Sequence, residues 1–481
     1  VASGGSARAL AAAGLAVTTV ESVTGFPEVL GGRVKTLHPA IHAGLLARPT
    51  DAHLSELADR GLQPIDLVAC NLYPFSATVA DPQVEEAAAI EQIDIGGVTL
   101  LRAAAKNFER VTVVCDPASY GPILEQLHRG PLPLATRRNL ALAAFCHTAA
   151  YDAAIATWLA GSDDGALPET LNLAAVRVET LRYGENPHQQ AATYRWQGAP
   201  PAFEQLQGKG LSYNNIADLD AALAMPAEFD QPAVAIVKHT NPCGLAVAED
   251  NISAFHKALA CDPVSAFGSI IATNREVGLP FVKAVGKLFV EVLVAPGFTE
   301  EALTRLRKQK PNCRVLRLLP TTPLRQPLAG LFMRSIDGGL LVQTQDESGA
   351  DRDTWKVVSR RQPEAAELED LAFAWLACKH VKSNAILLAH DGATVGVGAG
   401  QMNRVESVRI AARAAGEHAA GSVLASDAFF PFADGVEAAA AAGVVACIQP
   451  GGSIRDDEVI AAADRLGLVM ILTGKRHFRH A

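Results

Sequence analysis

The sequence lacks several features that mark specialised classes of protein. Its eight cysteines are scattered, and no two of them form a C-x-x-C pair. This distribution is typical of a reducing compartment and predicts no structural zinc site. No block of Lys and Arg stands out, and the net charge is −9, so a general nucleic-acid binder is not expected.

Long apolar runs and targeting signals are also missing. The longest apolar run, Ala438 to Ile448, is too short to span a membrane. No signal peptide is visible, and we therefore expect a cytoplasmic protein without a membrane partner. The chain opens without Met on the loop-like stretch VASGG, so we expect that residues precede Val1.

The residues that are present predict a well-packed chain with more than one core. Of its 481 residues, 49% are hydrophobic and 19% are charged, and this length favours about two to four domains. Residues 1–160 show a βαβ pattern, which is typical of a parallel sheet. Residues 161–168 resemble a linker. Residues 169–345, which are interrupted near their end by a Pro-rich stretch (311–327), and residues 366–481 each have an α/β pattern, and we expect two similar layered units.

Local patterns predict individual elements within these blocks. Short β-branched runs predict strands at Leu67–Leu72, Val111–Cys115, Ala233–Val237, Ala385–His390, Thr394–Gly400, Ser422–Ser426, Val444–Ile448 and Leu468–Thr473. Helical periodicity predicts helices at Gly97–Ala105, Arg137–Leu159, Glu367–Lys379, Arg404–Gly416 and Gly435–Ala442.

The most informative stretch is AVAIVKHTNPCG, residues 233–244. We expect its strand to end at Lys238 and His239, because Pro242 marks a break there. Ligands of α/β folds usually lie at such strand ends. A neighbouring cation disfavours a charged imidazole, so His239 would be a neutral base while Lys238 stabilises an oxyanion or leaving group. The alternative is a strand that simply ends in polar residues.

The first block contains two candidate phosphate-binding loops. Residues 31–39, GGRVKTLHP, place two glycines and the cations Arg33 and Lys35 before Thr36, a combination suited to a phosphate cradle. A second small-residue loop that opens a helix is formed by Ser3, Gly4, Gly5 and Ser6. Each loop is also explained by an ordinary turn.

Three further polar residues in this block have two interpretations. Tyr73 follows a predicted strand, Asp94 precedes a predicted helix, and Lys106 lies in the last turn of that helix. In isolation, Asp94 is most simply a helix N-cap and Lys106 a cation favoured at a helix C-terminus.

Several long motifs resemble one known family. They are GGRVKTLHPAIHAGLLAR, ACNLYPF, QIDIGGVTLLRAAAKN, RYGENPHQ, KHTNPCG, DPVSAFG, KHVKSNAI, GVGAGQMNRV and SDAFFPF, in this order. They resemble the signature stretches of the bifunctional AICAR transformylase/IMP cyclohydrolases of purine biosynthesis, which catalyse the last two steps to IMP. The resemblance covers essentially the whole chain and is to the compact bacterial-type form.

The resemblance implies the fold class and the domains. The expected fold is α/β, with a methylglyoxal-synthase-like parallel-sheet domain at residues 1–165 that lacks its first strand. The transformylase region, 166–481, would consist of two cytidine-deaminase-like α/β units, about 166–350 and 360–481. Family members also carry a first strand and a Ser/Lys/Thr phosphate loop before the position of Val1.

The resemblance implies that the first domain closes the ring of formyl-AICAR with loss of water. Arg33, Lys35 and Thr36 would lie at the phosphate and the reacting end, and an intramolecular attack needs mainly orientation. Asp94 could take the amide proton, while Lys35 and Lys106 stabilise developing oxyanion charge. Tyr73, Asp94 and Lys106 would line the ring, and Ser3, Gly4 and Gly5 would help to bind substrate.

The resemblance implies that the second region transfers the formyl group of 10-formyltetrahydrofolate to the 5-amino group of AICAR, with no metal required. His239 would be the general base, Lys238 the cation near the formyl oxygen, and Asn384 a hydrogen-bond partner of the formyl group. The family works as a homodimer with transformylase sites built from both chains. Substrate would also be bound by Arg182, Tyr183, His188, Arg404 (at the phosphate), Phe429, Phe430 and His480.

One departure and two alternatives complete the prediction. Animal members carry an acidic residue where this chain has Ser269, so no role is transferred to that position. A zinc deaminase would need H-x-E followed by P-C-x-x-C, but His239 is followed by Asn241, and Cys243 has no partner cysteine. A nucleotide-binding module without catalysis is the second alternative, against which the intact Lys238, His239 and Asn384 argue.

Overall fold

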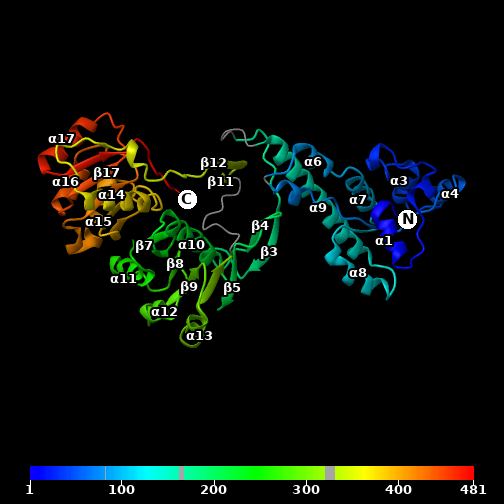
Figure 1. The fold of residues 1–481 in the computed structure, drawn as a ribbon, viewed down its shortest axis with the longest axis horizontal. Coiled ribbons are helices and arrows are strands. Elements are labelled where there is room, and N and C mark those ends of the chain that lie inside the picture. The colour runs from blue at the N-terminus through cyan, green and yellow to red at the C-terminus, as the bar shows by residue number, and fades with distance from the viewer. Residues whose placement is uncertain (82, 162–166, 320–330, 481) are drawn as a thin grey trace. The chain divides into compact units, whose positions relative to one another are not determined.

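The computed structural model describes residues 1–81, 83–161, 167–319 and 331–480. They form two compact units (Figure 1): unit 1 is Val1–Val176 with Trp196–Gly198, and unit 2 is Arg177–Arg195 with Ala199–Ala481. The predicted domain boundary at 165 and 166, most of the predicted linker and part of the Pro-rich stretch lie outside the described residues, so the domain limits stay predictions.

Unit 1 is built on a short parallel pair of strands. β1 (Leu67–Ala69) and β2 (Thr112–Val114) pair in parallel, with Val68 opposite Val113. This confirms the predicted parallel arrangement, although β1 ends before the predicted Leu72. The helices of unit 1 are α1 (Gly4–Ala12), α2 (Val20–Thr24), η1 (Leu30–Gly32), α3 (Pro39–Leu46), α4 (Asp51–Asp59), α5 (Phe75–Val79), α6 (Glu86–Glu91), α7 (Gly96–Lys106), η2 (Pro117–Ser119), α8 (Tyr120–Leu127) and α9 (Leu134–Ala160).

Helix α9 is the longest helix of unit 1. It packs against α7, α5 and β2, and its Ala144, Thr148 and Tyr151 are buried. By length and composition alone it is the one described helix that could cross a membrane, and 22% of its most apolar window is buried. Core helices pass the same test, so this is weak evidence for a membrane span.

Unit 2 is organised around one twelve-stranded sheet, in the order β13-β18-β17-β16-β14-β15-β7-β6-β8-β9-β10-β5. Its strands are β5 (Phe203–Gln207), β6 (Ala233–Lys238), β7 (Asn241–Val247), β8 (Ser269–Thr273), β9 (Val290–Ala295), β10 (Arg314–Leu318), β13 (Lys356–Val357), β14 (Ile386–His390), β15 (Ala393–Gly398), β16 (Val423–Ser426), β17 (Ala446–Gln449) and β18 (Val469–Leu472). Its helices are α10 (Tyr213–Ala224), η3 (Pro226–Glu228), α11 (Asn251–Cys261), α12 (Leu279–Val285), α13 (Glu300–Gln309), η4 (Arg352–Thr354), α14 (Ala365–Cys378), α15 (Arg404–Ala415), η5 (Gly416–Ala419), α16 (Asp434–Ala441) and α17 (Asp456–Leu466).

This sheet consists of two halves with the same topology. In the first half, β6 is antiparallel to β7 and β8, β8–β9–β10 run parallel, and β5 closes the edge antiparallel to β10. In the second half, β14 is antiparallel to β15 and β16, β16–β17–β18 run parallel, and β13 closes the edge. The halves meet where β15 pairs with β7. The two halves of this single sheet therefore share one topology, while the predicted limits of two units and their likeness to cytidine deaminase stay predictions.

Helices cover both faces of the sheet because its strands are apolar on both sides. Ala235 and Val237 of β6 face one cluster with α10 and α14, and this cluster extends across both halves. Val234 and Ile236, which alternate with them, face a second cluster with α11, α12 and α13. Alternate residues of a strand point to opposite faces, so β6 is buried from both sides.

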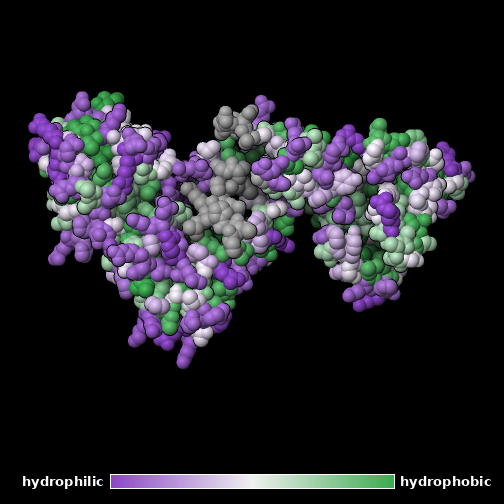
Figure 2. Space-filling view, in the orientation of Figure 1, coloured by the Kyte–Doolittle hydropathy of each residue, from purple (hydrophilic) through white to green (hydrophobic). Residues whose placement is uncertain are grey.

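Two smaller sheets lie outside this framework. β3 (Ala175–Leu181) pairs with β4 (Ala191–Trp196), and β11 (Leu331–Ile336) pairs with β12 (Gly339–Thr344) in an antiparallel hairpin. The β11–β12 hairpin exposes several large apolar side chains, at 42% for Phe332 and 58% for Leu341. On the visible face of both units, apolar residues otherwise lie among polar ones (Figure 2).

The predicted end of the central strand was wrong in one respect. Pro242 does not interrupt the sheet, because β7 begins at Asn241 and includes Pro242. The register between β6 and β7 shifts between Ile236 and Val237, so Cys243 is an extra residue of β7 and forms a bulge next to Pro242. Proline, which has no N–H to donate, is tolerated at bulges. β7 can therefore include Pro242 and pair with β6 in a tight hairpin.

Candidate functional site

The first candidate site is organised by the turn between β6 and β7. His239 and Thr240 form this two-residue turn with φ of 52° and 59°. Positive φ at both positions is the signature of a type I′ hairpin turn, which favours Asn or Asp followed by Gly. A β-branched Thr in this conformation is an outlier, and such strain of about 1–3 kcal/mol is typical of functional positions.

Lys238 and His239 are presented differently by this turn. Lys238 is half-buried, and its Nζ donates to the carbonyl of Phe267 at 3.0 Å. His239 is exposed, and no described residue forms a hydrogen bond with its ring. Burial raises the pKa of the nearby Cys243 thiol to about 12, so Cys243 is not a thiolate nucleophile at neutral pH.

Asn241 connects the turn to a loop in the second half of unit 2. Its Nδ2 donates to the carbonyl of His239 at 3.0 Å, and its Oδ1 accepts from the backbone N–H of Lys382 at 3.2 Å. Lys382 lies two residues before Asn384, so the motifs KHTNPCG and KHVKSNAI meet at this point. The structure therefore brings together the predicted Lys238–His239 pair and the loop that carries Asn384.

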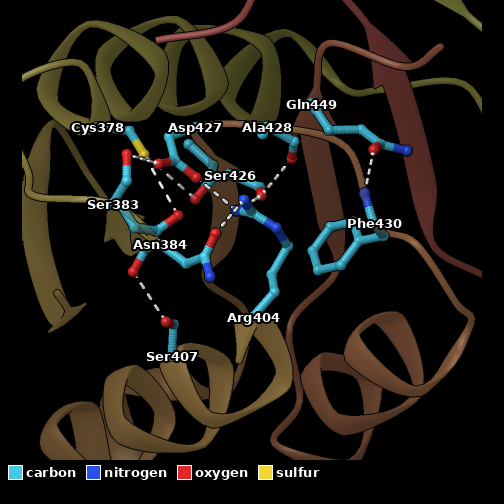
Figure 3. Close-up of polar contacts among 12 residues, drawn as sticks. Cys378, Ser383, Asn384, Arg404, Ser407, Ser426, Asp427, Ala428, Phe430 and Gln449 are labelled. Atoms are coloured by element: carbon cyan, nitrogen blue, oxygen red, sulfur yellow. Dashed lines mark hydrogen bonds and ion pairs between the residues drawn. The ribbon is translucent and has the colours of Figure 1, made fainter. Parts of the chain in front are cut away.

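Asn384 is held by an extensive network of polar contacts (Figure 3). Its Oδ1 accepts from the guanidinium of Arg404 at 2.8 Å, and its own carbonyl accepts from Ser407. Its Nδ2 donates to the carbonyl of Gln401 at 2.8 Å. The second terminal nitrogen of the Arg404 guanidinium donates to Ser426 and Asp427. Arg404 was predicted as a phosphate ligand; here these donors are bound by protein groups, and the phosphate role stays a prediction.

A buried charge cluster supports this loop from behind. Glu228 accepts from the ammonium of Lys379 at 2.8 Å and contacts Nε2 of His380 at 2.9 Å. Burial lowers the pKa of His380 to about 4, although its contact with Glu228 opposes the shift. Burial raises the pKa of Glu228, but hydrogen bonds and charges from His380 and Lys379 outweigh it and leave the pKa lowered. Arg479 near the C-terminus contacts Nδ1 of His380, so the imidazole bridges a carboxylate and a guanidinium.

The remaining predicted transformylase residues are more dispersed. Arg182 lies over the ring of Tyr183, with 5.5 Å between its Cζ and the ring centroid, and His188 is exposed in the same loop. Phe429 is 39% exposed, whereas Phe430 is a core residue whose backbone N–H donates to Gln449. His480 packs edge-on against Phe478. No contact joins Arg182, Tyr183, His188 or His480 to His239 among the described residues.

The second candidate site lies in unit 1 around Lys35. A small pocket of about 40 Å³ is lined by Lys35, Ser3, Gly4, Thr19 and Glu28, among others. Lys35 pairs with Glu28 at 3.3 Å, and a Cβ at Gly32 would lie 2.9 Å from the Lys35 ammonium. Gly32 also has a φ of 95°, a backbone conformation that favours glycine. The predicted small-residue loop and the predicted cation meet in this pocket, whereas Gly5 is not part of its lining.

Asp94 lies at the start of α7. Its Oδ1 accepts from the backbone N–H of Gly97 at 2.7 Å, and its own N–H donates to the hydroxyl of Tyr151 at 2.9 Å. Asp94 thus binds a backbone N–H in the first turn of α7, as expected of a capping side chain, although the N-cap position itself is occupied by Ile95. Burial raises the pKa of Tyr151, and the charges of Asp94 and Tyr73 add to this shift. Tyr73, Asp94 and Tyr151 are therefore neighbours, and Tyr73 is 47% exposed.

Three predicted residues of unit 1 have other immediate surroundings. Thr36 lies against the start of α7, since a Cβ at Gly96 would be 3.0 Å from its hydroxyl. Arg33 forms an exposed ion pair with Glu91, and this hydrogen bond raises the pKa of Arg33. Lys106 ends α7, whose 11 residues at about 1.5 Å per residue separate it from Asp94 by roughly 16 Å. Lys106 and Asp94 therefore lie at opposite ends of α7.

Some residues of both sites were missed by sequence reasoning. Asp218, Glu228 and Tyr151 act through contacts with residues that lie far away in the chain, and no local pattern marks them. Asp427 lies in the motif SDAFFPF, directly after a predicted strand. Polar residues at strand ends are candidate site residues, and this position could have identified Asp427. Among the described residues, no group of three His, Cys, Asp or Glu side chains is placed to hold a metal ion.

Comparisons with known proteins agree on one family. The family described as AICARFT/IMPCHase bienzyme matches residues 104–414, and the MGS-like domain matches residues 1–99. Proteins named bifunctional purine biosynthesis protein PurH are similar over the full chain: that of Chloroflexus aurantiacus is 54% identical over 490 residues and covers 100% of this chain and 93% of that protein. Those of Cyanothece sp. and Halalkalibacterium halodurans are 53% and 52% identical, each covering 100% of this chain and 94% of the relative. A solved structure described as the crystal structure of ForH is 40% identical, covers 32% of this chain and 81% of that chain, and has a TM-score of 0.30.

Proposed function

This chain belongs to the AICARFT/IMPCHase bienzyme family, and we propose that its two reactions take place at the two groups of residues described above. The chain is a bifunctional enzyme of purine biosynthesis. It transfers the formyl group of 10-formyltetrahydrofolate to AICAR and then cyclises formyl-AICAR to IMP. Which residues perform each step is our proposal.

Formyl transfer is assigned to the turn between β6 and β7. The 5-amino group of AICAR attacks the formyl carbon, and His239, exposed at the tip of the turn, accepts the proton of the amine. The bond from the formyl carbon to the folate nitrogen then breaks, and this nitrogen takes up a proton as tetrahydrofolate leaves. Lys238 lies beside His239 and stabilises the charge that develops on the formyl oxygen or on the folate nitrogen. Asn384 orients the formyl group from the neighbouring loop. The observation that carries this assignment is the link from His239 through Asn241 to Lys382, because it joins two distant motifs at one place.

Ring closure is assigned to the region around Lys35 and Asp94. The carboxamide nitrogen attacks the formyl carbon of the same molecule, so the enzyme must mainly hold the reacting conformation. Asp94 accepts a proton from the attacking amide, and Lys35 stabilises the oxyanion before water leaves. Ser3, Gly4 and Gly5 offer backbone N–H groups at the start of α1 to the phosphate, and Arg33, Thr36 and Tyr73 complete the substrate site.

A homodimer is the second part of the proposal. An isolated two-stranded hairpin is marginal in water, and the exposed apolar residues of β11 and β12 support a covering by a second copy. Lys106 lies at the opposite end of α7 from Asp94, and this favours a contribution of Lys106 to the ring-closure site of the partner. The predicted contributions of Arg182, Tyr183, His188, Arg404, Phe429, Phe430 and His480 to AICAR binding, shared between chains, belong to the same proposal, as does a cytoplasmic location.

Two separated assays test the assignment of residues. Lys238→Met should reduce formyl transfer by about 10²–10³-fold and leave the conversion of supplied formyl-AICAR to IMP unchanged. Lys35→Met should reduce the conversion of formyl-AICAR to IMP and leave formyl transfer unchanged. Equal losses of both activities in either variant would contradict the division of labour.

Mixing two inactive variants tests the shared cyclohydrolase site. Lys106→Met and Asp94→Asn chains should each be inactive in ring closure, whereas a mixture reassembled from both should regain part of the activity. Sedimentation of the wild-type protein as a monomer, or no recovery in the mixture, would refute the dimer proposal.

A further inference from the structure

Unit 2 contains two hairpin turns with the same backbone geometry. His239 and Thr240 connect β6 to β7 with φ of 52° and 59°, and Asp391 and Gly392 connect β14 to β15 with φ of 51° and 66°. The two hairpins occupy corresponding places in the two halves of the sheet. Asp followed by Gly adopts this turn readily, because Gly tolerates positive φ without steric cost. His followed by Thr does not.

A carboxylate from the preceding helix holds each turn. Oδ1 of Asp218 in α10 accepts from the backbone N–H of Thr240 at 2.7 Å. Oδ1 of Asp370 in α14 accepts from the N–H of Gly392 at 2.8 Å, and its Oδ2 accepts from the N–H of Asp391 at 2.9 Å. The two carboxylates are equivalent in the two halves, but only Asp218 holds a turn whose residues resist the required conformation.

We infer that Asp218 is a positioning residue for formyl transfer, which fixes the left-handed turn and thereby the direction of the His239 side chain. This inference rests on the proposed role of His239. Thr240 follows His239 directly, so rotation of the Thr240 backbone would move the imidazole. Asn241 on the other side of Thr240 donates to the carbonyl of His239, and the turn is thus fixed from both sides.

The other polar contacts of the turn do not replace this hydrogen bond. The hydroxyl of Thr240 and the amide of Asn241 both donate to the carbonyl of His239. Neither of these donors binds the backbone N–H of Thr240, and beyond the turn Asn241 reaches only the N–H of Lys382 in the second half. Asp218 provides the anchor, because α10 packs against β6 and β8 and begins with a capping box formed by Ser212 and Asn215.

Alanine at each carboxylate gives a matched pair of variants. Asp218→Ala should lower kcat for formyl transfer by about ten- to a hundred-fold, the range expected when a catalytic group is misplaced by an ångström or less, with a smaller change in KM for AICAR. Asp370→Ala should leave formyl transfer within about twofold of wild type, because Asp391–Gly392 keeps its turn unaided. Ring closure of supplied formyl-AICAR, which is assigned to unit 1, should be unchanged in both, and a wild-type far-UV circular dichroism spectrum controls for the folding of unit 2.

Two rescue variants separate positioning from general stability. Asp218→Asn keeps a carbonyl oxygen that can accept the same hydrogen bond and should retain most of the activity. Thr240→Gly in the Asp218→Ala background should recover activity, because Gly adopts the turn without help. If Asp218→Ala does not fold, Asp218→Ser, whose oxygen is too short to reach the turn, serves in its place with the same expected loss.

The outcomes distinguish this inference from the proposed function. Wild-type kcat in Asp218→Ala, or equal losses in Asp218→Ala and Asp370→Ala, would overturn the role of Asp218. Failure of Thr240→Gly to recover any activity would do the same. Full formyl transfer in His239→Ala would instead show that the assignment of the site itself is wrong.

Discussion

The two halves of unit 2 share one topology but differ in the residues of their hairpin turns. Both halves have a helix, a bulged hairpin and three parallel strands separated by helices, and both anchor the hairpin turn by an Asp from that first helix. Asp391–Gly392 forms the corresponding turn in the second half with residues that adopt it readily. His239–Thr240 in the first half is therefore not required by the fold, and this favours a functional reason for its presence.

The surroundings of the two turns differ in the same sense. Asp391 pairs with Lys257 at 2.8 Å on the surface, and its side chain is 77% exposed. The His239 turn instead meets the loop of Lys382 and, beyond it, the buried Asn384–Arg404–Asp427 network. The two halves thus share one framework, but only the His239 turn contacts a buried polar network.

Removing Arg404 should have the largest effect on stability. Arg404→Met leaves the fully buried Asp427 without its cationic partner, and breaking a buried pair costs about 3–5 kcal/mol. Asn251 occupies the corresponding start of α11, where its side chain makes an exposed hydrogen bond to the carbonyl of Glu276. Asn251→Ala should cost less than about 1 kcal/mol. Urea unfolding followed by tryptophan fluorescence measures both, and similar costs for the two variants would contradict the asymmetry.

Acid should weaken the contact between the two halves at Glu228 and His380. The pKa of His380 is lowered to about 4 from an ordinary 6.5, so the unfolded chain binds a proton below pH 6.5 while the folded one does not. The free energy of unfolding should fall by up to about 3 kcal/mol as the pH drops from 6.5 to 4. Lys379 and Arg479, which face the imidazole, oppose its protonation. Below about pH 4.5 the stabilisation from Glu228, whose pKa is lowered, is lost as well.

His380→Gln tests this linkage through the slope of stability against pH. The variant should lose the part of the slope that lies between pH 6.5 and 4, whatever its stability at pH 7. His418→Gln, at an exposed position in η5, should retain the wild-type slope. An unchanged slope in His380→Gln would show that His380 is not the group that titrates.

Two equivalent glycines should respond alike. A Cβ at Gly244 would lie 1.8 Å from the carbonyl of Ala258 in α11, and one at Gly396 would lie 2.2 Å from the carbonyl of Ala411 in α15. Each Gly→Ala change must push a helix away from its hairpin, at a cost of about 1–3 kcal/mol. Thermal unfolding of both variants checks this, and a neutral result at only one of them would show that the two hairpins are packed differently.

Exchanging the residues at the second position of the two turns should have the smallest effect on the free energy of unfolding. One exchange should raise it and the other should lower it. Thr240→Gly relieves a left-handed β-branched residue, a gain of about 1–2 kcal/mol reduced by the greater flexibility of Gly in the unfolded chain. Gly392→Thr introduces the same strain and should destabilise by about 1 kcal/mol. Urea midpoints that shift in the same direction would contradict a difference in strain between the turns.

Most of the framework followed from local patterns in the sequence. Helices such as α7 and α14 and the buried strands β6 and β14 lie close to their predicted ranges, because apolar periodicity reflects burial directly. The hairpin was not expected, since Pro242 normally argues against a strand and only the bulge in the pairing with β6 makes room for it. The joining of two half-sheets at Ala246 and Ala393 depends on long-range pairing, which no local pattern encodes.

The sites divide in the same way. Lys238, His239, Asn384, Lys35 and Asp94 could be selected because they lie in motifs at the ends of predicted elements. Asp218 and Glu228 could not, because their partners lie far along the chain. The buried Arg404–Asp427 pair joins the start of a predicted helix to the residue after a predicted strand, and no local pattern in the sequence indicates that they meet.

The most direct test of the account compares the two turns in one assay. Formyl transfer from 10-formyltetrahydrofolate to AICAR would be measured for His239→Ala and for Asp391→Ala, together with AICAR binding by each. The account predicts a loss of about 10²–10⁴-fold for His239→Ala with AICAR binding retained, and wild-type turnover for Asp391→Ala. Unchanged turnover in His239→Ala, or equal losses in the two variants, would contradict the claim that only the first half carries the catalytic turn.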